Sequence, residues 1–285
     1  MTARLASDRP LLFGGDWTKT KLDIIERYLN AYTTALKGQR FNLMYIDAFA
    51  GTGRVGIPKE DAEGRELLRG SVERALAVRD RAFDHLVLIE KDEAQYRELL
   101  TLQRKHSGRD IRVLNEDANI VLRDLGKDWR GWRGVLFLDP FGTQVDWTTV
   151  QSICHTNALD TWVLFPVGTI QRMLPRSRRP DEISPKWVRR LDRIYGGDSW
   201  RDLYSLSEQL PLLGPRQERR EPGVSGLLRI YQRQLRDLFG NRFLDKSGTL
   251  RNSRDSPLFE LLFVVGNAAG NRPAKNIAGH LLRDI

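Results

Sequence analysis

Short apolar runs alternate with amphipathic stretches from residue 17 to residue 166. The apolar runs predict five strands, near residues 43–47, 85–90, 111–114, 135–139 and 160–166. Apolar residues at helical spacing predict helices near residues 17–36, 71–80, 92–105, 119–126 and 147–157. Strands that alternate with helices form a parallel sheet that is covered on both faces. The pattern therefore predicts an α/β fold with a doubly wound sheet.

The pattern changes after residue 168. Residues 169–222 are rich in proline and arginine and mostly helical in spacing, and residues 224–239 predict an amphipathic helix. Residues 257–266 are again very apolar and predict a late strand that returns to the sheet, for which the sequence offers no obvious partner. We therefore divide the chain into residues 1–168 with the parallel strands, a mostly helical insertion at 169–256, and a C-terminal returning strand at 257–285.

Polar residues follow the predicted strands where they end. Asp47 ends the first strand and is followed by the compact turn Phe49-Ala50-Gly51-Thr52-Gly53, which presents backbone N–H groups to a ligand. Taken alone, this motif is also typical of a structural turn in which glycine supplies only a positive φ. The next three strands end in Glu90, in Asp117 and Asn119, and in Asp139-Pro140-Phe141-Gly142. Together these strand ends indicate a ligand site at a topological switch point.

The order of these motifs resembles class I S-adenosylmethionine-dependent methyltransferases. The resemblance implies a Rossmann-like methyltransferase sheet, with S-adenosylmethionine as cofactor and residues 1–168 as the cofactor-binding part. Asp47 to Gly53 would then form the glycine-rich motif at the methionine end, and Glu90 would accept hydrogen bonds from the ribose hydroxyls. Asp117 and Asn119 would contact the adenine. Asp139-Pro140 would begin an Asp-Pro-Pro-Tyr type motif, whose carboxylate and proline carbonyl accept hydrogen bonds from the amine to be methylated.

Most of the chain, roughly residues 13 to 280, is also similar to the three-Cys-motif partner protein family, TcmP. The matching motifs are Trp17-x3-Lys21-Leu22, Asp47-x-Phe49-Ala50-Gly51-x-Gly53, Gly70-Ser71, Asp139-Pro140-Phe141-Gly142 and Phe259-x3-Phe263. This resemblance implies a methyltransferase-like protein and a radical-enzyme partner that carries a three-cysteine motif. It does not supply a substrate. Lys21 either reaches the carboxylate of the cofactor or is an exposed lysine of the first helix.

Two features depart from these patterns. An acidic residue follows the glycine turn of a dinucleotide-binding unit by about 20 residues, whereas Glu90 lies 43 residues after Asp47. The excess is the polar stretch 54–70, which is either a lid over the ligand or a long surface loop. In the fourth motif, Phe141-Gly142 stands where Pro-Tyr is expected, so an aromatic ring that stacks on a base is displaced or absent. Asp139-Pro140 is alternatively a turn that ends a strand, since proline favours extended geometry before it.

Basic residues are concentrated in the insertion. Residues 169–256 contain 19 Lys and Arg, of which 17 are Arg, against 11 Asp and Glu, whereas the whole chain carries a net charge of +9. Arginine clusters there alternate with Trp187, Tyr195, Trp200 and Tyr204, a combination that suits phosphate contacts and base stacking. The candidates for binding nucleic acid or another polyanion are Arg176, Arg178, Arg179, Arg189 and Arg190. The alternative is a solvated face whose aromatic residues belong to the core.

Composition limits the other possibilities. The 285 residues contain one cysteine, which excludes an internal disulfide and a cysteine-based metal site. We expect Cys154 to pack in the helix after the fourth strand, the alternative being a reactive thiol. The four histidines lack a metal-ligand spacing, so no metal site is predicted. No apolar run approaches about 18 residues and no leader pattern opens the chain, so we expect a cytoplasmic protein without a membrane segment.

Three functions fit these observations. The first is an S-adenosylmethionine-dependent methyltransferase acting on an amino group of nucleic acid or of a modified nucleoside. The second is a catalytically silent, nucleic-acid-binding partner protein that keeps the fold as a scaffold. The third is a nicotinamide-dependent oxidoreductase, because Gly51, Gly53 and Gly56 spell Gly-x-Gly-x-x-Gly. Against the third, no carboxylate follows at the expected spacing and no Tyr-x3-Lys is evident.

Overall fold

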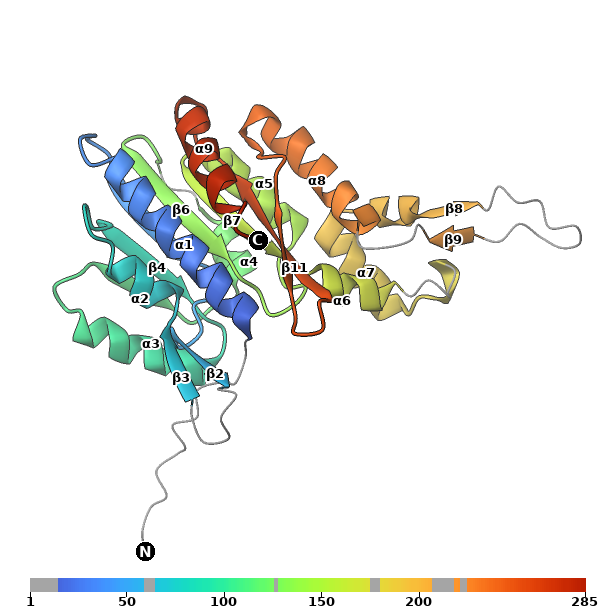
Figure 1. Ribbon diagram of the computed structural model, residues 1–285, viewed down its shortest axis with the longest axis horizontal. Coiled ribbons are helices and arrows are strands. Elements are labelled where there is room, and N and C mark those ends of the chain that lie inside the picture. The colour runs from blue at the N-terminus through green and yellow to red at the C-terminus, as the bar shows by residue number, and fades with distance from the viewer. Residues whose placement is uncertain (1–14, 59–64, 126–127, 175–179, 207–217, 221–224) are drawn as a thin grey trace, which may run out of the picture.

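A seven-stranded mixed sheet forms the centre of the computed structural model, which describes residues 15–58, 65–125, 128–174, 180–206, 218–220 and 225–285 (Figure 1). The strands lie in the order β10-β11-β7-β6-β1-β4-β5. Their bounds are β1 Asn42–Asp47, β4 His85–Ile89, β5 Ile111–Leu114, β6 Trp132–Leu138, β7 Leu159–Phe165, β10 Gly248–Arg251 and β11 Pro257–Val264. The five strands from β5 to β7 pair in parallel, and β11 and β10 follow antiparallel. The predicted α/β fold class is confirmed.

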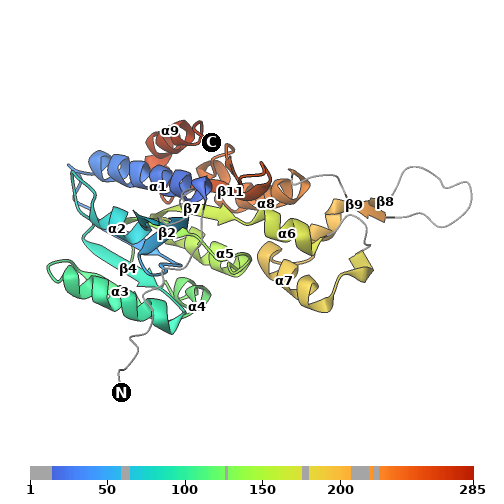
Figure 2. The same cartoon turned by 60° about the horizontal axis from the view of Figure 1, so that its bottom comes forward.

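Helices cover both faces of this sheet because the strands are buried on both sides and read as continuous apolar runs. One core contains residues of α1, α2, α3 and α9, and the other contains residues of α4 to α8. Figure 2 shows α1 and α9 on one side of the sheet and α5 on the other. The helix bounds are α1 Asp16–Ala35, α2 Ser71–Leu76, α3 Glu93–Lys105, α4 Ala118–Arg123, α5 Trp147–Thr156, α6 Val167–Met173, α7 Pro185–Tyr195, α8 Ser225–Phe239 and α9 Asn271–Leu281.

The polar stretch after the glycine turn forms a β-hairpin. Its strands, β2 Arg54–Pro58 and β3 Arg65–Arg69, pair antiparallel apart from the main sheet. The backbone N–H of Gly70 donates to the carbonyl of Gly53 at 3.0 Å, so the two ends of the hairpin lie next to each other beside the glycine turn. This hairpin accounts for the long spacing between Asp47 and Glu90, and α2 still begins beside the glycine turn.

The partner of the returning strand β11 is the short strand β10. The two pair antiparallel from Gly248↔Leu261 to Arg251↔Pro257, with an irregularity at Leu250/Arg251. Glu260 of β11 is buried and accepts hydrogen bonds from the hydroxyls of Ser247 at 2.5 Å and Thr249 at 2.9 Å. The sequence did not reveal β10 because four residues with only Leu250 as a large apolar side chain give no readable alternation. The strand lies within the stretch 169–256, whose boundaries stay a prediction.

The segment between β7 and β10 packs on α5 through aromatic side chains. The rings of Phe165 and Tyr231 stack with centroids 4.2 Å apart, and Trp147 of α5 meets Tyr231 edge-on at 5.6 Å. Tyr195, Trp200 and Tyr204 are all buried here. The prediction that these three aromatic residues stack on bases is therefore wrong, because they are buried in the core. The small strands β8 Tyr204–Leu206 and β9 Glu218–Arg220 project away from the sheet (Figure 1).

Candidate cofactor and acceptor site

The glycine turn after β1 is held against the end of β4. Gly51 and Gly53 have φ of 58° and 77°, values that residues with a Cβ rarely adopt. The N–H of Ala50 donates to the carbonyl of Ile89 at 3.0 Å, and that of Gly51 donates to Glu90 Oε2 at 2.9 Å. The chain then enters β2, so Gly56 does not open a helix as the nicotinamide fingerprint requires. The oxidoreductase alternative therefore loses the motif on which it depended.

Asp47 is fully buried beneath this turn. Its carboxylate accepts hydrogen bonds from the hydroxyls of Ser71 at 2.5 Å and Tyr45 at 3.0 Å, and from the N–H of Phe49 at 3.3 Å. Burial raises the pKa of Asp47 to about 6, although the Ser71 and Tyr45 hydrogen bonds oppose the shift and the nearby Asp139 charge adds to it. Asp47 thus links the turn to the first residue of α2. It does not line either of the cavities described below.

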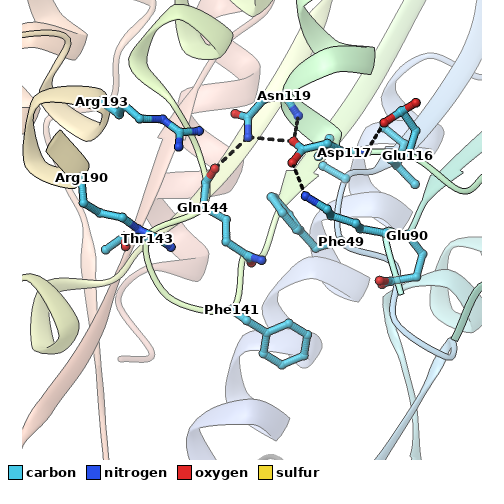
Figure 3. A pocket seen from close by; sticks show the side chains of 14 residues that line it. Phe49, Glu90, Glu116, Asp117, Asn119, Phe141, Thr143, Gln144, Arg190 and Arg193 are labelled. Atoms are coloured by element: carbon cyan, nitrogen blue, oxygen red, sulfur yellow. Dashed lines mark hydrogen bonds and ion pairs between the residues drawn. The ribbon is translucent and has the colours of Figure 1, made fainter. Parts of the chain in front are cut away.

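A cavity of about 220 Å³ lies at the ends of β4 and β5 (Figure 3). Its wall includes Glu90, whose Oε1 also accepts from the N–H of Asp92 at 2.7 Å. Each carboxylate oxygen of Glu90 thus receives one backbone hydrogen bond and keeps a second lone pair for a ligand. The buried carboxylate is therefore fixed in place while it remains able to accept from two hydroxyls.

Asp117 and Asn119 line the same cavity and have different roles in the fold. The Asp117 carboxylate caps α4 by accepting from the N–H of Asn119 at 2.9 Å, and it accepts from Lys91 Nζ at 3.0 Å. Burial alone would raise the pKa of Asp117, but the hydrogen bonds from Lys91 and Asn119 outweigh it and lower the pKa below its ordinary value.

The side-chain amide of Asn119 holds a loop. Its Nδ2 donates to Asp117 Oδ1 and to the carbonyl of Gln144, and its Oδ1 accepts from the N–H of Asp146 and the hydroxyl of Thr149. These four hydrogen bonds use all the donors and acceptors of the amide. Asn119 therefore positions the 143–146 segment and has no hydrogen-bonding capacity left to read an adenine edge.

A second cavity, of about 560 Å³, adjoins the first, and Phe49 and Phe141 line both. Its wall brings together the glycine turn, the Asp139-Pro140-Phe141-Gly142 segment after β6, and one face of α1. Lys21 of α1 is 4% exposed and forms an ion pair with Asp139. The alternative that Lys21 is an exposed helix lysine is therefore wrong, because its ammonium lies inside the cavity against a carboxylate.

Several residues of this larger cavity were not among the predicted site residues. Trp17 and Phe259 pack ring to ring at 5.0 Å across its edge, and Thr18, Ser71 and Gln95 complete the wall. Trp17 and Phe259 belong to the TcmP-like motifs, so the sequence carried a signal for them. Thr18 could have been found from the helical spacing that places it on the same face as Lys21.

Phe141 stands at the boundary of the two cavities with 52% of its surface exposed. Gly142 follows with φ of 78°, which turns the chain sharply after the aromatic residue. The structure thus places an aromatic ring at the mouth of the site, one position earlier than the tyrosine of an Asp-Pro-Pro-Tyr motif.

Two arginines of α7 reach the smaller cavity from the side opposite Glu90 (Figure 3). Arg190 Nε donates to Thr143 Oγ1 at 2.5 Å, and Arg193 forms a bidentate pair with Asp146 at 2.9 Å for both hydrogen bonds. Arg193 was not predicted. Arg189 is exposed on α7, whereas the predicted Arg176, Arg178 and Arg179 lie outside the described residues. Cys154 is buried in α5, as predicted.

Comparisons with known proteins agree with the fold. No family model matches the chain, and no curated protein matches its sequence. Protein LPL1258 from Legionella pneumophila is similar in structure with a TM-score of 0.50 and 12% identity, over 92% of this chain and 90% of that chain. Trm1 from Pyrococcus horikoshii, solved with S-adenosyl-L-methionine, has a TM-score of 0.47 and 12% identity, over 92% of this chain and 59% of that chain.

An S-adenosylmethionine-dependent methyltransferase from Clostridium acetobutylicum gives a TM-score of 0.40 and 12% identity, over 88% of this chain and 92% of that chain. At 12% identity and a TM-score of 0.50, the likeness to LPL1258 is one of fold alone. The residues that line the two cavities are therefore the basis for inferring an activity. Within the described residues, no helix is long and apolar enough to cross a bilayer, and no three His, Cys, Asp or Glu side chains converge as metal ligands do.

Proposed function

We propose that this chain is an S-adenosylmethionine-dependent methyltransferase that methylates an amino nitrogen of nucleic acid or of a modified nucleoside. The observation that carries the proposal is the pair of adjoining cavities at the carboxyl edge of the sheet. One presents Glu90 and Asp117, and the other presents the glycine turn beside Asp139. A ligand with an adenosine at one end and an amino acid at the other has groups complementary to both.

The polar groups of the two walls fit this cofactor. Glu90 keeps one lone pair on each oxygen, which suits the two ribose hydroxyls. At the other end, Gly51 and Gly53 let a ligand approach the backbone, and the buried hydroxyl of Thr18 has no partner within the described residues. Bound there, the cofactor supplies a methyl group that its sulfonium makes electrophilic. The protein must then place a nucleophile in line and exclude water.

Asp139 and Phe141 supply the acceptor end of the proposed site. The Asp139 carboxylate and the Pro140 carbonyl would accept hydrogen bonds from an amine, which points its lone pair at the methyl group. In this arrangement Asp139 and Pro140 would hold the nitrogen in line with the methyl group that the cofactor would supply, and Asp139 or water would take up the proton that the amine gives up. The exposed ring of Phe141 offers a flat surface on which a base can stack.

A polyanionic acceptor is supported by charge. Residues 169–256 hold most of the basic excess, and Lys186 and Arg189 are exposed on α7, the helix whose Arg190 lines the smaller cavity. We propose this stretch as the acceptor-binding part of the chain. The TcmP-like motifs further support a partnership with a radical enzyme that carries three cysteines. The motif residues Trp17, Lys21 and Phe259 meet in the larger cavity.

The test is calorimetric titration with S-adenosylmethionine. We expect micromolar binding by the wild type and at least a tenfold loss in Glu90→Gln, because hydrogen bonds to a charged group are worth about 1.5–3 kcal/mol each. Glu93→Gln, an exposed carboxylate on α3, is the matched control and should bind normally. Methyl transfer from labelled cofactor is then screened on single- and double-stranded RNA and DNA. A folded wild type that does not bind the cofactor would instead support the catalytically silent scaffold.

A further inference from the structure

The first turns of α1 place two polar groups with unused hydrogen-bonding capacity in the larger cavity. Lys21 carries three N–H donors, and within the described residues its hydrogen-bond partner is Asp139 alone. Thr18, one turn earlier on the same face, is 3% exposed, and its hydroxyl has no partner there. Both side chains line the wall that also contains Gly51 and Gly53.

The surroundings of Lys21 make this unused capacity costly. Its Nζ lies 5.2 Å from the centre of the Trp17 ring and 5.8 Å from that of Phe137, so aromatic faces replace much of the water around it. Buried donors without acceptors destabilise the protein. An ammonium and a hydroxyl on one helix face therefore fit a ligand group that accepts several hydrogen bonds and carries negative charge. A carboxylate meets both conditions.

We propose that Thr18 and Lys21 bind the carboxylate at the amino-acid end of the cofactor, and that this binding takes Lys21 away from Asp139. In the free protein, Lys21 occupies the carboxylate that the acceptor amine needs. Once the cofactor engages the ammonium, Asp139 is free to accept from the amine. This inference rests on the proposed function, and it adds an order of events, in which the cofactor binds first and makes Asp139 available.

The position of Asp139 supports such a release. Its side chain is 23% exposed, whereas that of Lys21 is 5% exposed, so the carboxylate faces the open part of the cavity and the ammonium faces the interior. The buried Asp47 lies close enough for the charge of Asp139 to raise the pKa of Asp47. Without Lys21, Asp139 would therefore have a negative neighbour on its inner side. An N–H group of the amine to be methylated then becomes the favoured hydrogen-bond partner of Asp139.

The test compares two ligands that differ only in the amino-acid part. S-adenosylhomocysteine carries the carboxylate, and 5′-deoxy-5′-methylthioadenosine lacks it. We expect Lys21→Met to weaken S-adenosylhomocysteine about tenfold and Thr18→Val about threefold, with methylthioadenosine changed less than about twofold in both. Asp139→Asn should tighten S-adenosylhomocysteine about threefold, because Lys21 no longer has a charged competitor. Lys19→Met, an exposed lysine of the same helix, is the matched control.

The outcomes separate this inference from the proposed function. If the wild type binds none of the adenosyl ligands, the proposed function fails and this inference with it. If S-adenosylhomocysteine binds but Asp139→Asn leaves its affinity unchanged or weakens it, the exchange of partners is overturned while the proposed function stands. Equal losses for both ligands in Lys21→Met, in a protein that melts like the wild type, would also overturn the carboxylate site.

Discussion

At the scale of single residues, Asp47 shows how the fold uses a buried carboxylate that lines neither cavity. It is buried at the end of β1 with three hydrogen bonds that join the glycine turn, β1 and α2. The resemblance to class I methyltransferases implies that this residue orients nearby polar groups, and that role stays a prediction. Glu90 and Asp139, which line the cavities, directly follow β4 and β6, the strands on either side of β1.

We predict that Asp47 makes the protein less stable as the pH rises from about 4 to 6. Its folded-state pKa of about 6 lies above the ordinary aspartate value of 3.8, so the folded state binds more protons than the unfolded state in this window. Relative to wild type, Asp47→Asn should therefore gain up to about 3 kcal/mol between pH 4 and pH 7. Urea unfolding at several pH values measures this difference.

Asp160 allows a second test of how a buried carboxylate affects stability. It is buried, its pKa is also raised to about 6 by burial, and it accepts from Tyr28 at 2.6 Å and from Gly266 at 2.7 Å. Asp160→Asn should show the same direction of change. A difference between wild type and either variant that stays constant across this pH range would contradict the assignment for that residue.

At the scale of elements, α7 fixes the segment that follows the Asp139–Gly142 turn. Arg190 and Arg193 lie three residues apart on one face of α7, contacting Thr143 and Asp146, while Asn119 holds the same segment from α4. The insertion therefore contributes to the geometry of the site although its sequence suggests only a charged surface. Because Asp139 and Phe141 stand directly before this segment, its order sets where they point.

We predict that Arg193→Ala and Asp146→Asn each increase amide hydrogen exchange in residues 139–146. The bidentate pair is partly exposed, so the local stability lost should be about 1 kcal/mol or less. The double variant should lose no more than either single one, because both remove the same contact. Arg189→Ala, on the exposed side of the helix, should leave exchange in this segment unchanged. Additive losses would indicate that the two residues act separately.

At the scale of the whole molecule, the basic residues are unevenly distributed along the chain, which leads to a prediction about nucleic-acid binding. Removing Lys186 and Arg189 together should weaken the binding of a labelled single-stranded oligonucleotide and lower the slope of log K against log salt by about 1.4. The double variant Arg104→Ala, Lys105→Ala removes the same charge from exposed positions of α3. Fluorescence anisotropy over a salt series measures both. Equal effects of the two variants would show that only net charge matters.

Much of the sheet could be predicted from sequence because its five parallel strands are continuous apolar runs with polar ends. The edge strand β10 could not, since it has four residues and takes its place from β11 and from the hydroxyls that reach Glu260. Glu90 and Asp139 could be placed at the sheet edge from their positions after strands. Two features could not be predicted: the burial of Lys21, and the fact that all hydrogen-bonding groups of the Asn119 amide are already paired. Both depend on contacts between residues more than 20 positions apart in the sequence, which no local pattern reveals.

The hairpin of β2 and β3 has a consequence for how such a chain can diverge. The residues that flank it, Gly53 and Gly70, are joined by a backbone hydrogen bond. The length of the hairpin is therefore independent of the spacing between the strands of the main sheet. Lengthening a loop whose ends already meet costs only about 0.6 kcal/mol for each doubling. Evolution can therefore exchange this segment for longer or shorter versions without altering the glycine turn or Glu90.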